Sequence, residues 1–251
     1  EGGQEPEQDR PLIAQAHASG ARGWLLVLCG LLSLVCTSQL AVALVNWLAT
    51  LLALPQPLPR MDFSKGIPPE SRALVVIPTL LFSAENIEDL VEALEVCFLG
   101  NRDENLHLGL LTDFEDAREE TLPQDESLLQ LAAQRIAELN EKYRGNNGSK
   151  AGDADSDREG DIFFLFHRPR HWNPRERVWM GRERKRGKLG DLNALLRGGA
   201  TAPFSRIVGR FAVLSGVKYV ITLDTDTQQP RDAARQLVGT MAHPLNRARY
   251  D

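Results

Sequence analysis

Apolar and polar positions alternate in two different patterns over the last two thirds of the chain. Four short continuous apolar runs, each typical of a buried strand, lie at residues 73–77, 106–111, 162–166 and 219–223. Apolar residues recur at helical spacing after Ser83, a predicted helix N-cap, and over residues 128–139, and a further helix is predicted from residues 191–196. This alternation predicts an α/β fold with a doubly wound, mostly parallel sheet, whose ligands bind at the carboxyl ends of the strands.

A much longer apolar run lies near the start of the sequence. Residues 24–54 contain no Asp, Glu, Lys or Arg, and about 20 apolar residues are enough to span a bilayer. The run is too short for two spans with a turn, so we expect one tilted transmembrane segment over residues 23–54. A cleaved signal peptide would have a shorter apolar region and a small-residue cleavage site. We therefore expect the lipid bilayer to be a partner of the chain.

Polar and proline-rich stretches divide the rest of the sequence. Residues 1–22 form a polar tail, and the prolines of residues 55–70 predict an extended linker. We expect residues 71–251 to form the soluble domain, with a mobile Gly/Asp/Ser-rich loop at residues 144–161. Because the first residue is Glu and the last three carry no stop signal, we expect the sequence to be an excerpt of a longer protein.

Composition narrows the functions that the chain can have. A net charge of −5 and a pI near 5.6 argue against a dedicated nucleic-acid binder, which needs a basic excess to neutralise phosphates. Cys29, Cys36 and Cys97 match neither a disulfide framework nor a zinc spacing. Any site for an anion must therefore depend on a local concentration of positive charge.

Two aspartates directly follow the last apolar run. On a strand, Asp224 and Asp226 would point to the same face and repel each other unless a cation lies between them, so we predict a divalent metal there. Pro78, Thr79 and Asp113 also follow predicted strands, and all of these residues would line one crevice. For Asp113 alone, an ordinary turn or cap residue is an equally good interpretation.

A basic tract precedes the predicted metal site. Residues 175–193 hold seven basic and two acidic side chains before a Gly-Asp-Leu-Asn sequence. Such a tract is also typical of a solvated loop or a nuclear-localisation signal, although a membrane span argues against nuclear import. Beside a metal site it indicates a phosphate-bearing ligand, and Gly187 and Gly190 would let the backbone come close. Phosphate and a divalent metal together suggest a nucleotide-like substrate.

These motifs resemble those of a known enzyme class. Lys188-Leu189-Gly190-Asp191-Leu192-Asn193, followed about 30 residues later by a strand ending in Asp-x-Asp (DxD), is similar to the motifs of membrane-bound GT-A-type glycosyltransferases such as cellulose synthases. Longer stretches, among them VVIPTLLFSAENIEDLVEALEV and YVITLDTDTQQPRDAARQLVGTMAHPLNRARYD, resemble the glucosyltransferase region of bacterial cyclic β-1,2-glucan synthases. The resemblance covers nearly everything from about residue 71 onward.

The resemblance implies a site for UDP-glucose in a GT-A-like sheet. Pro78, Thr79 and Glu85 would lie near the uridine, Asp113 would contact the nucleotide, and Lys188 would approach the diphosphate. The implied nucleotide-sugar-binding set comprises Pro78, Thr79, Glu85, Asp113, Lys188, Asp191, Asn193 and Asp224.

The resemblance also implies the cofactor and the reaction. Asp224 and Asp226 would hold Mg²⁺ or Mn²⁺ against the phosphate oxygens, where the metal offsets charge developing on the departing UDP. The enzyme would transfer glucose to a glucan acceptor with inversion, on the cytoplasmic side of a bacterial inner membrane. The catalytic base of related enzymes lies well after the DxD motif, so we expect it beyond Asp251 and expect the chain as given to be incomplete and inactive.

Three other functions compete with this interpretation. A processive β-glucan polymerase of the cellulose-synthase kind would share the same motifs. A phosphatase could use Leu-Asp-Thr-Asp-Thr as its strand motif, although Gln228 does not fit that pattern. A non-enzymatic, membrane-tethered module could bind anionic lipid headgroups through its basic tract.

Overall fold

The computed structural model describes residues 23–53, 57–144, 160–199 and 201–247. The predicted polar tail and most of the predicted mobile loop lie outside these residues. The chain divides into two units, Glu1–Pro57 and Leu58–Asp251.

The first unit contains helix α2 (Gly23–Leu52), 30 residues long. None of its residues is buried, and its mean hydropathy reaches 2.2 over its most apolar window. At about 1.5 Å per residue the helix is roughly 45 Å long, which exceeds the ~30 Å hydrocarbon core of a bilayer. By length and composition it can cross a membrane.

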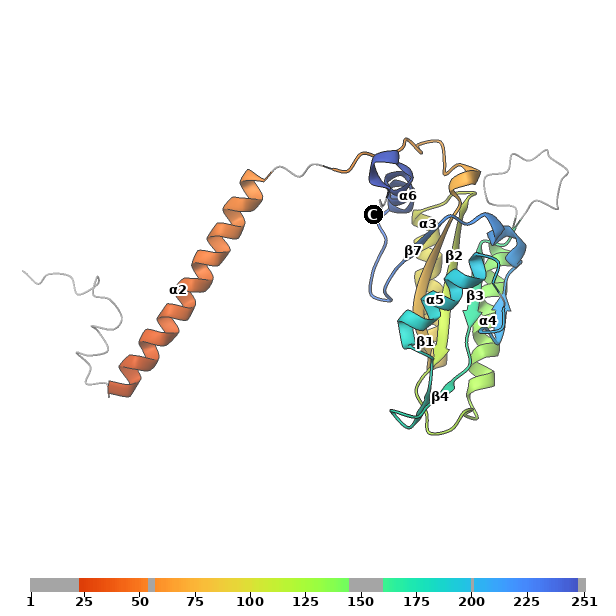
Figure 1. Cartoon of the computed structure of the whole chain (residues 1–251), viewed down its shortest axis with the longest axis horizontal. Helices are drawn as coiled ribbons and strands as arrows, with labels where there is room; N and C mark the ends of the chain where they lie inside the picture. The colour runs from red at the N-terminus through yellow and green to blue at the C-terminus, as the bar shows by residue number, and fades with distance from the viewer. Residues whose placement is uncertain (1–22, 54–56, 145–159, 200, 248–251) are drawn as a thin grey trace, which may run out of the picture. The chain divides into compact units, whose positions relative to one another are not determined.

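The second unit is built on a five-stranded sheet in the order β6-β3-β2-β1-β7 (Figure 1). The strands are β1 (Ala73–Leu81), β2 (Leu106–Phe114), β3 (Phe163–His167), β6 (Arg206–Val208) and β7 (Tyr219–Thr222). All neighbours pair in parallel except β6, which runs antiparallel to β3. The predicted α/β class and the mostly parallel sheet are confirmed, and the GT-A-like topology stays a prediction.

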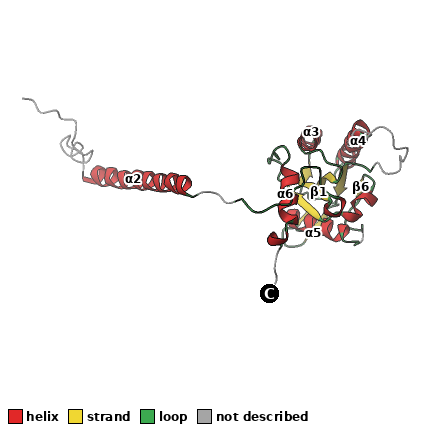
Figure 2. Ribbon diagram, turned by 90° about the horizontal axis from the view of Figure 1, so that it is seen from above, coloured by secondary structure: helices red, strands yellow, loops and turns green. Residues whose placement is uncertain are grey.

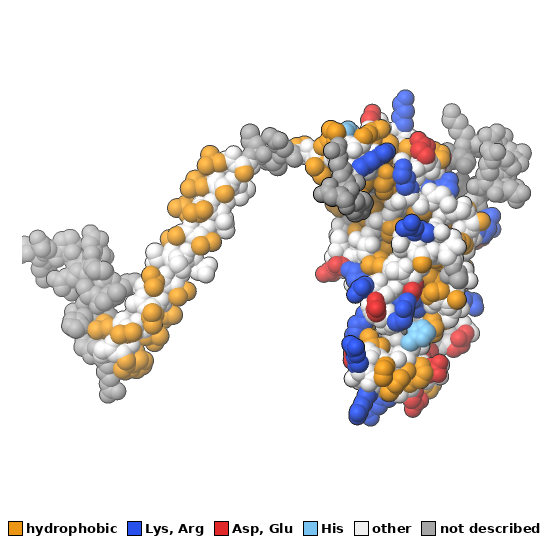
Figure 3. Space-filling model, in the orientation of Figure 1, with side chains coloured by type: hydrophobic (Ala, Val, Ile, Leu, Met, Phe, Trp, Pro, Cys, Tyr) orange, Lys and Arg blue, Asp and Glu red, His pale blue; other side chains and the backbone are white. Residues whose placement is uncertain are grey.

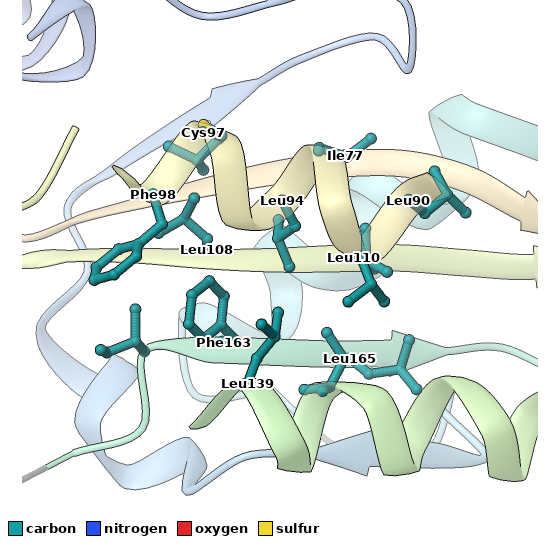
Figure 4. Close-up of a cluster of buried hydrophobic side chains, with 14 of the residues drawn as sticks. Ile77, Leu90, Leu94, Cys97, Phe98, Leu108, Leu110, Leu139, Phe163 and Leu165 are labelled. Atoms are coloured by element: carbon teal, nitrogen blue, oxygen red, sulfur yellow. The ribbon is translucent and has the colours of Figure 1, made fainter. Parts of the chain in front are cut away.

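Helices cover both faces of the sheet (Figure 2). One face packs against α3 (Ala84–Gly100), α4 (Asp125–Tyr143) and α6 (Ala233–Ala242), and the other against α5 (Arg184–Leu196) and the short helix η4 (Phe211–Gly216). Alternate strand residues point to opposite faces, so Val75 and Leu108 enter the first core while Leu74 and Leu111 enter the second. Figure 4 shows the first core, where Phe98 and Leu94 of α3 meet Phe163 and Leu108.

The helix predicted after Ser83 is confirmed with its cap. The Ser83 hydroxyl accepts a hydrogen bond from the backbone N–H of Asn86, which satisfies one of the free donors of the first turn. The short hairpin of β4 (His171–Asn173) and β5 (Val178–Met180), and strand β6, were not predicted, because runs of three residues carry no clear period. The helix expected from residue 191 already begins at Arg184.

The strand predicted over residues 219–223 is confirmed, but the prediction that it is buried is wrong. Strand β7 ends at Thr222 and is the edge strand beside β1, with Val220 and Thr222 exposed. Its apolar residues alternate between a half-buried and an exposed position, since only one neighbouring strand and one helical layer cover them. The remaining short helices are η2 (Pro69–Ser71) and η5 (Pro244–Asn246).

Candidate functional site

Three of the predicted site residues meet at the carboxyl ends of β1 and β2. Thr79 and Asp113 lie near the ends of these two parallel strands, where Thr79 pairs with Thr112. Lys188 reaches them from α5: its ammonium donates to the backbone oxygen of Thr79 at 2.6 Å and lies 3.2 Å from Oδ2 of Asp113. Thr79 and Asp113 were expected at the carboxyl ends of neighbouring strands, and the register places them there. That they line a ligand site with Lys188 stays a prediction.

Arg168 holds this group together and was missed by the sequence analysis. Its guanidinium donates to both oxygens of Asp113, each at 2.9 Å, and to Oδ2 of Asp191 at 2.6 Å. Arg168 and Asp113 are almost completely buried. A planar guanidinium suits such two-pronged recognition of a carboxylate, which a lysine at this position could not reproduce.

The strand register explains why Arg168 faces Asp113. Thr112 pairs with His167 across β2 and β3, and the backbone N–H of Arg168 donates to the oxygen of Thr112 at 3.0 Å. Asp113 directly follows Thr112 in β2, and Arg168 directly follows His167, the last residue of β3. The two charged side chains therefore point to the same face of the sheet. One signal could have identified Arg168. It is a basic residue directly after an apolar strand, opposite an acidic residue at the carboxyl end of the neighbouring strand.

Charges inside the cluster are balanced. Two cations, Arg168 and Lys188, face two carboxylates, Asp113 and Asp191, and the half-exposed Arg182 adds a bond of 2.9 Å to Asp191. Burial opposes the charge on Arg168, yet its hydrogen bonds to Asp113 and the nearby carboxylate charges raise its pKa. Burial lowers the pKa of Lys188, and Asp113 opposes that effect. Buried ions need this degree of pairing, because leaving one unpaired costs several kcal/mol.

A tight loop closes over Asp113. A Cβ atom on Gly181 would lie only 2.2 Å from Oδ2 of Asp113, so only glycine allows this approach. The next residues, Glu183 and Arg184, adopt positive φ angles of 52° and 48°, which is uncommon outside glycine. Arg168 donates to the backbone oxygens of Arg182 and Arg184 at 3.1 and 3.3 Å and so fixes this loop. In this conformation Asp113 is sealed from solvent.

The two aspartates of the DxD motif lie beyond the end of β7. Both are exposed, and the backbone N–H of Thr227 donates to the oxygen of Asp224 at 3.0 Å, which places them in a turn. The expectation that Asp224 and Asp226 share one face of a strand is therefore wrong. Asp224 forms an ion pair with Lys185 of α5. Within the part of the chain that the structure describes, no group of three or more His, Cys, Asp or Glu side chains is placed to hold a metal ion by itself.

The other predicted residues lie outside the buried cluster. Glu85 is exposed in the first turn of α3, and Asn193 is exposed on α5. Pro78 is half-buried within β1, on the opposite face of the strand from Thr79. The structure thus brings together Thr79, Asp113, Lys188 and Asp191. A ligand-binding role for each of the predicted site residues stays a prediction.

Arg170 forms a second buried ion pair two residues after Arg168. It binds Asp125 at the start of α4 and donates to the backbone oxygen of Glu120 at 3.2 Å. Its guanidinium also lies 4.9 Å from the ring centre of Phe114. This pair fastens the loop between β2 and α4 and includes none of the predicted site residues.

Comparison with known proteins supports the resemblance drawn from the motifs. No protein-family model matches the chain. A cyclic β-(1,2)-glucan synthase, NdvB of Rhizobium meliloti (strain 1021), is 40% identical over 229 residues, which is 91% of this chain. The chain spans 8% of the length of that relative. The predicted resemblance to glucan synthases is thereby confirmed for a segment of such a protein.

Proposed function

We propose, from its similarity to a segment of a cyclic β-(1,2)-glucan synthase, that this chain is the donor-binding part of an inverting glucosyltransferase. The enzyme would be anchored in a bacterial inner membrane by α2 and would use UDP-glucose on the cytoplasmic side to build cyclic β-1,2-glucan. The observation that carries the proposal is 40% identity along 91% of the chain.

The geometry of the sheet supports the same assignment. Thr79, Asp113 and Lys188 meet at the carboxyl ends of β1 and β2, and the DxD turn follows β7, which pairs with β1. All these residues therefore belong to one edge of a mostly parallel sheet. Ligands of open α/β sheets bind at this edge.

The DxD turn suits a divalent cation that also binds phosphate. Asp224 and Asp226 are exposed carboxylates two residues apart, and Mg²⁺ and Mn²⁺ prefer oxygen donors of this kind, completed by substrate phosphates. When bound, the metal would offset the charge that develops on the departing UDP. The ammonium of Lys185 already forms an ion pair with Asp224, so a carboxylate of this turn can stabilise a positive charge.

The chain's own residues would bind and orient the donor. Arg168 holds Asp113 and Asp191 in fixed positions, and its bonds to the loop before α5 order the basic residues that would face the diphosphate. Because UDP-glucose carries an α linkage and the proposed product a β linkage, a single inverting displacement is required.

Isothermal titration of the complete protein tests this proposal. We expect UDP-glucose to bind more tightly than UDP-galactose or GDP-mannose, and to do so only with Mn²⁺ or Mg²⁺ present. Asp226→Asn should remove the metal-dependent binding while leaving the circular dichroism spectrum unchanged. Metal-dependent affinity that survives in this variant would refute the metal site, and equal affinity for the three nucleotide sugars would refute the donor. Transfer of labelled glucose from UDP-glucose into β-1,2-glucan tests the reaction itself.

A further inference from the structure

An apolar surface remains exposed on one side of α6. The helix buries Ala234 and Val238 in the core, yet its neighbouring side chains point outward. The exposed apolar residues of α6, η5 and the preceding linker, 42% to 75% accessible, are Leu58, Met61, Leu237, Met241 and Leu245. We call these five residues the α6 surface. In Figure 3 apolar side chains gather at the α6 end of the domain, with Lys and Arg side chains close by.

The linker is hydrogen-bonded to this part of the domain. The N–H of Met61 donates to the oxygen of Gly239 at 2.9 Å, and the side chain of Asn246 donates to the oxygen of Pro59 at 2.7 Å. A Cβ atom on Gly239 would lie 2.8 Å from the oxygen of Met61, so a glycine is required for this close packing. The chain that arrives from α2 therefore first joins the domain at α6.

The length of the linker limits how far α6 can lie from a membrane. Helix α2 ends at Leu52, and Leu58 follows six residues later. An extended or polyproline chain spans at most about 3.1–3.6 Å per residue, so the two positions are separated by no more than about 20 Å. With α2 in a bilayer, this length lets the α6 surface reach the lipid headgroups.

The charges around the α6 surface suit an anionic membrane. Residues 58–65 and 229–247 contain five basic and two acidic side chains, although the whole chain has a net charge of −5. The basic residues are Arg60, Lys65, Arg231, Arg235 and Arg247. Arg235 pairs with Asp103 and Asp232, and Arg231 pairs with Asp232, so the charges of Arg60, Lys65 and Arg247 carry this argument. Helices that lie in the membrane interface combine an apolar face with flanking Lys and Arg in this way.

We propose that the α6 surface inserts into the boundary between headgroups and acyl chains of an anionic bilayer. The proposal rests on the anchoring by α2 put forward above, and adds a second contact that fixes the distance of the domain from the membrane.

The test uses the complete protein in vesicles of phosphatidylcholine and phosphatidylglycerol with brominated acyl chains. An environment-sensitive fluorescent amino acid is encoded singly at Met241, at Leu245, at Leu40 within α2, and at the exposed Glu119 between β2 and α4. We expect acyl-chain quenching at positions 241, 245 and 40, and none at position 119, where aqueous iodide should quench instead.

Each outcome bears on a different part of the proposal. Quenching by iodide alone at positions 241 and 245, with lipid quenching at 40, overturns membrane docking and leaves the anchor intact. Protection from both quenchers at 241 and 245 also overturns it, because protein then covers the α6 surface. Loss of lipid quenching at position 40 overturns the anchor itself.

A pair of variants separates docking from general damage. Leu237→Asp with Leu245→Asp should abolish acyl-chain quenching of the probe at position 241. Val96→Asp, at an exposed apolar residue of α3, is the matched control and should leave that quenching unchanged. Equal effects of both changes would contradict a specific surface on α6.

Discussion

Replacing Arg168 with methionine should weaken both the local fold and the proposed donor site. Arg168 makes three hydrogen bonds of 2.6–2.9 Å to carboxylate oxygens, and without it Lys188 is the one cation left against Asp113 among the residues that the structure describes. Breaking a buried ion pair by removing one partner costs about 3–5 kcal/mol. The free energy of local opening around β2 and the start of α5 should fall by that amount.

Hydrogen exchange of the complete protein measures this change directly. Peptides from residues 106–114 and 181–196 should exchange roughly 10²- to 4 × 10³-fold faster in Arg168→Met, because about 1.4 kcal/mol corresponds to a factor of ten. The affinity for UDP-glucose should fall by about tenfold or more, since Asp113, Asp191 and the loop before α5 lose their common support. Arg168→Lys keeps the charge but not the two-pronged bond, so an intermediate loss is expected.

Arg170→Met provides the matched control. Arg170 is as deeply buried as Arg168, also pairs with a buried aspartate, and lies two residues away on the same segment. Its loss should increase exchange near the start of α4 to a similar extent but change the affinity for UDP-glucose by less than about twofold. If the two variants reduced donor affinity equally, Arg168 would have a structural role alone and the reasoning would fail.

Three further outcomes are expected. Gly181→Ala should speed hydrogen exchange in residues 181–188 because its Cβ would overlap Asp113, whereas Gly190→Ala, whose Cβ meets nothing within 4 Å, should not. Lys185→Ala should tighten Mn²⁺ binding without nucleotide by about two- to fivefold, as followed by electron paramagnetic resonance, because an exposed ion pair competes only weakly with the metal. Burial, followed by the charge of Arg72, lowers the pKa of His107 to about 4, so the folded state resists protonation and stability should fall as pH drops from 6.5 to 4. The thermal midpoint of His107→Gln should depend less on pH in this window, and an unchanged slope would refute the assignment.

The strands and most helices were predictable because each is specified by its own local sequence. The run at 73–77 lies within β1, and the spacing of Ile87, Leu90 and Leu94 matches the buried face of α3. Local sequence placed Asp113 after a strand, whereas it lies near the carboxyl end of β2, one residue before the last. Local sequence did not identify Arg168 as the partner of Asp113. The two residues are 55 positions apart in the sequence, and the register between β2 and β3 brings them together.

Burial was harder to predict than secondary structure. An apolar run has the same sequence whether it lies in the centre of a sheet or at its edge, so β7 was wrongly expected to be buried. The early start of α5 was missed for a different reason. Its first residues are basic and interrupted by Gly187, which lowers helix propensity, and the bonds from Arg168 to the loop at Arg182 and Arg184 come from another strand.

The structure divides the basic tract into two groups with different roles. Lys188 lies inside the domain, where Asp113 balances its charge, so it adds little to the field outside. Four others have side chains that are half or more exposed near the start of α5, namely Arg182, Arg184, Lys185 and Arg186. The first turn of α5 has no acidic residue, and positive side chains there oppose the helix dipole. Each of these four side chains pairs with a carboxylate, namely Asp191, Asp116, Asp224 and Glu183. Because exposed ion pairs of this kind are weak, a bound diphosphate could replace these carboxylates as the partner of the basic side chains at little cost.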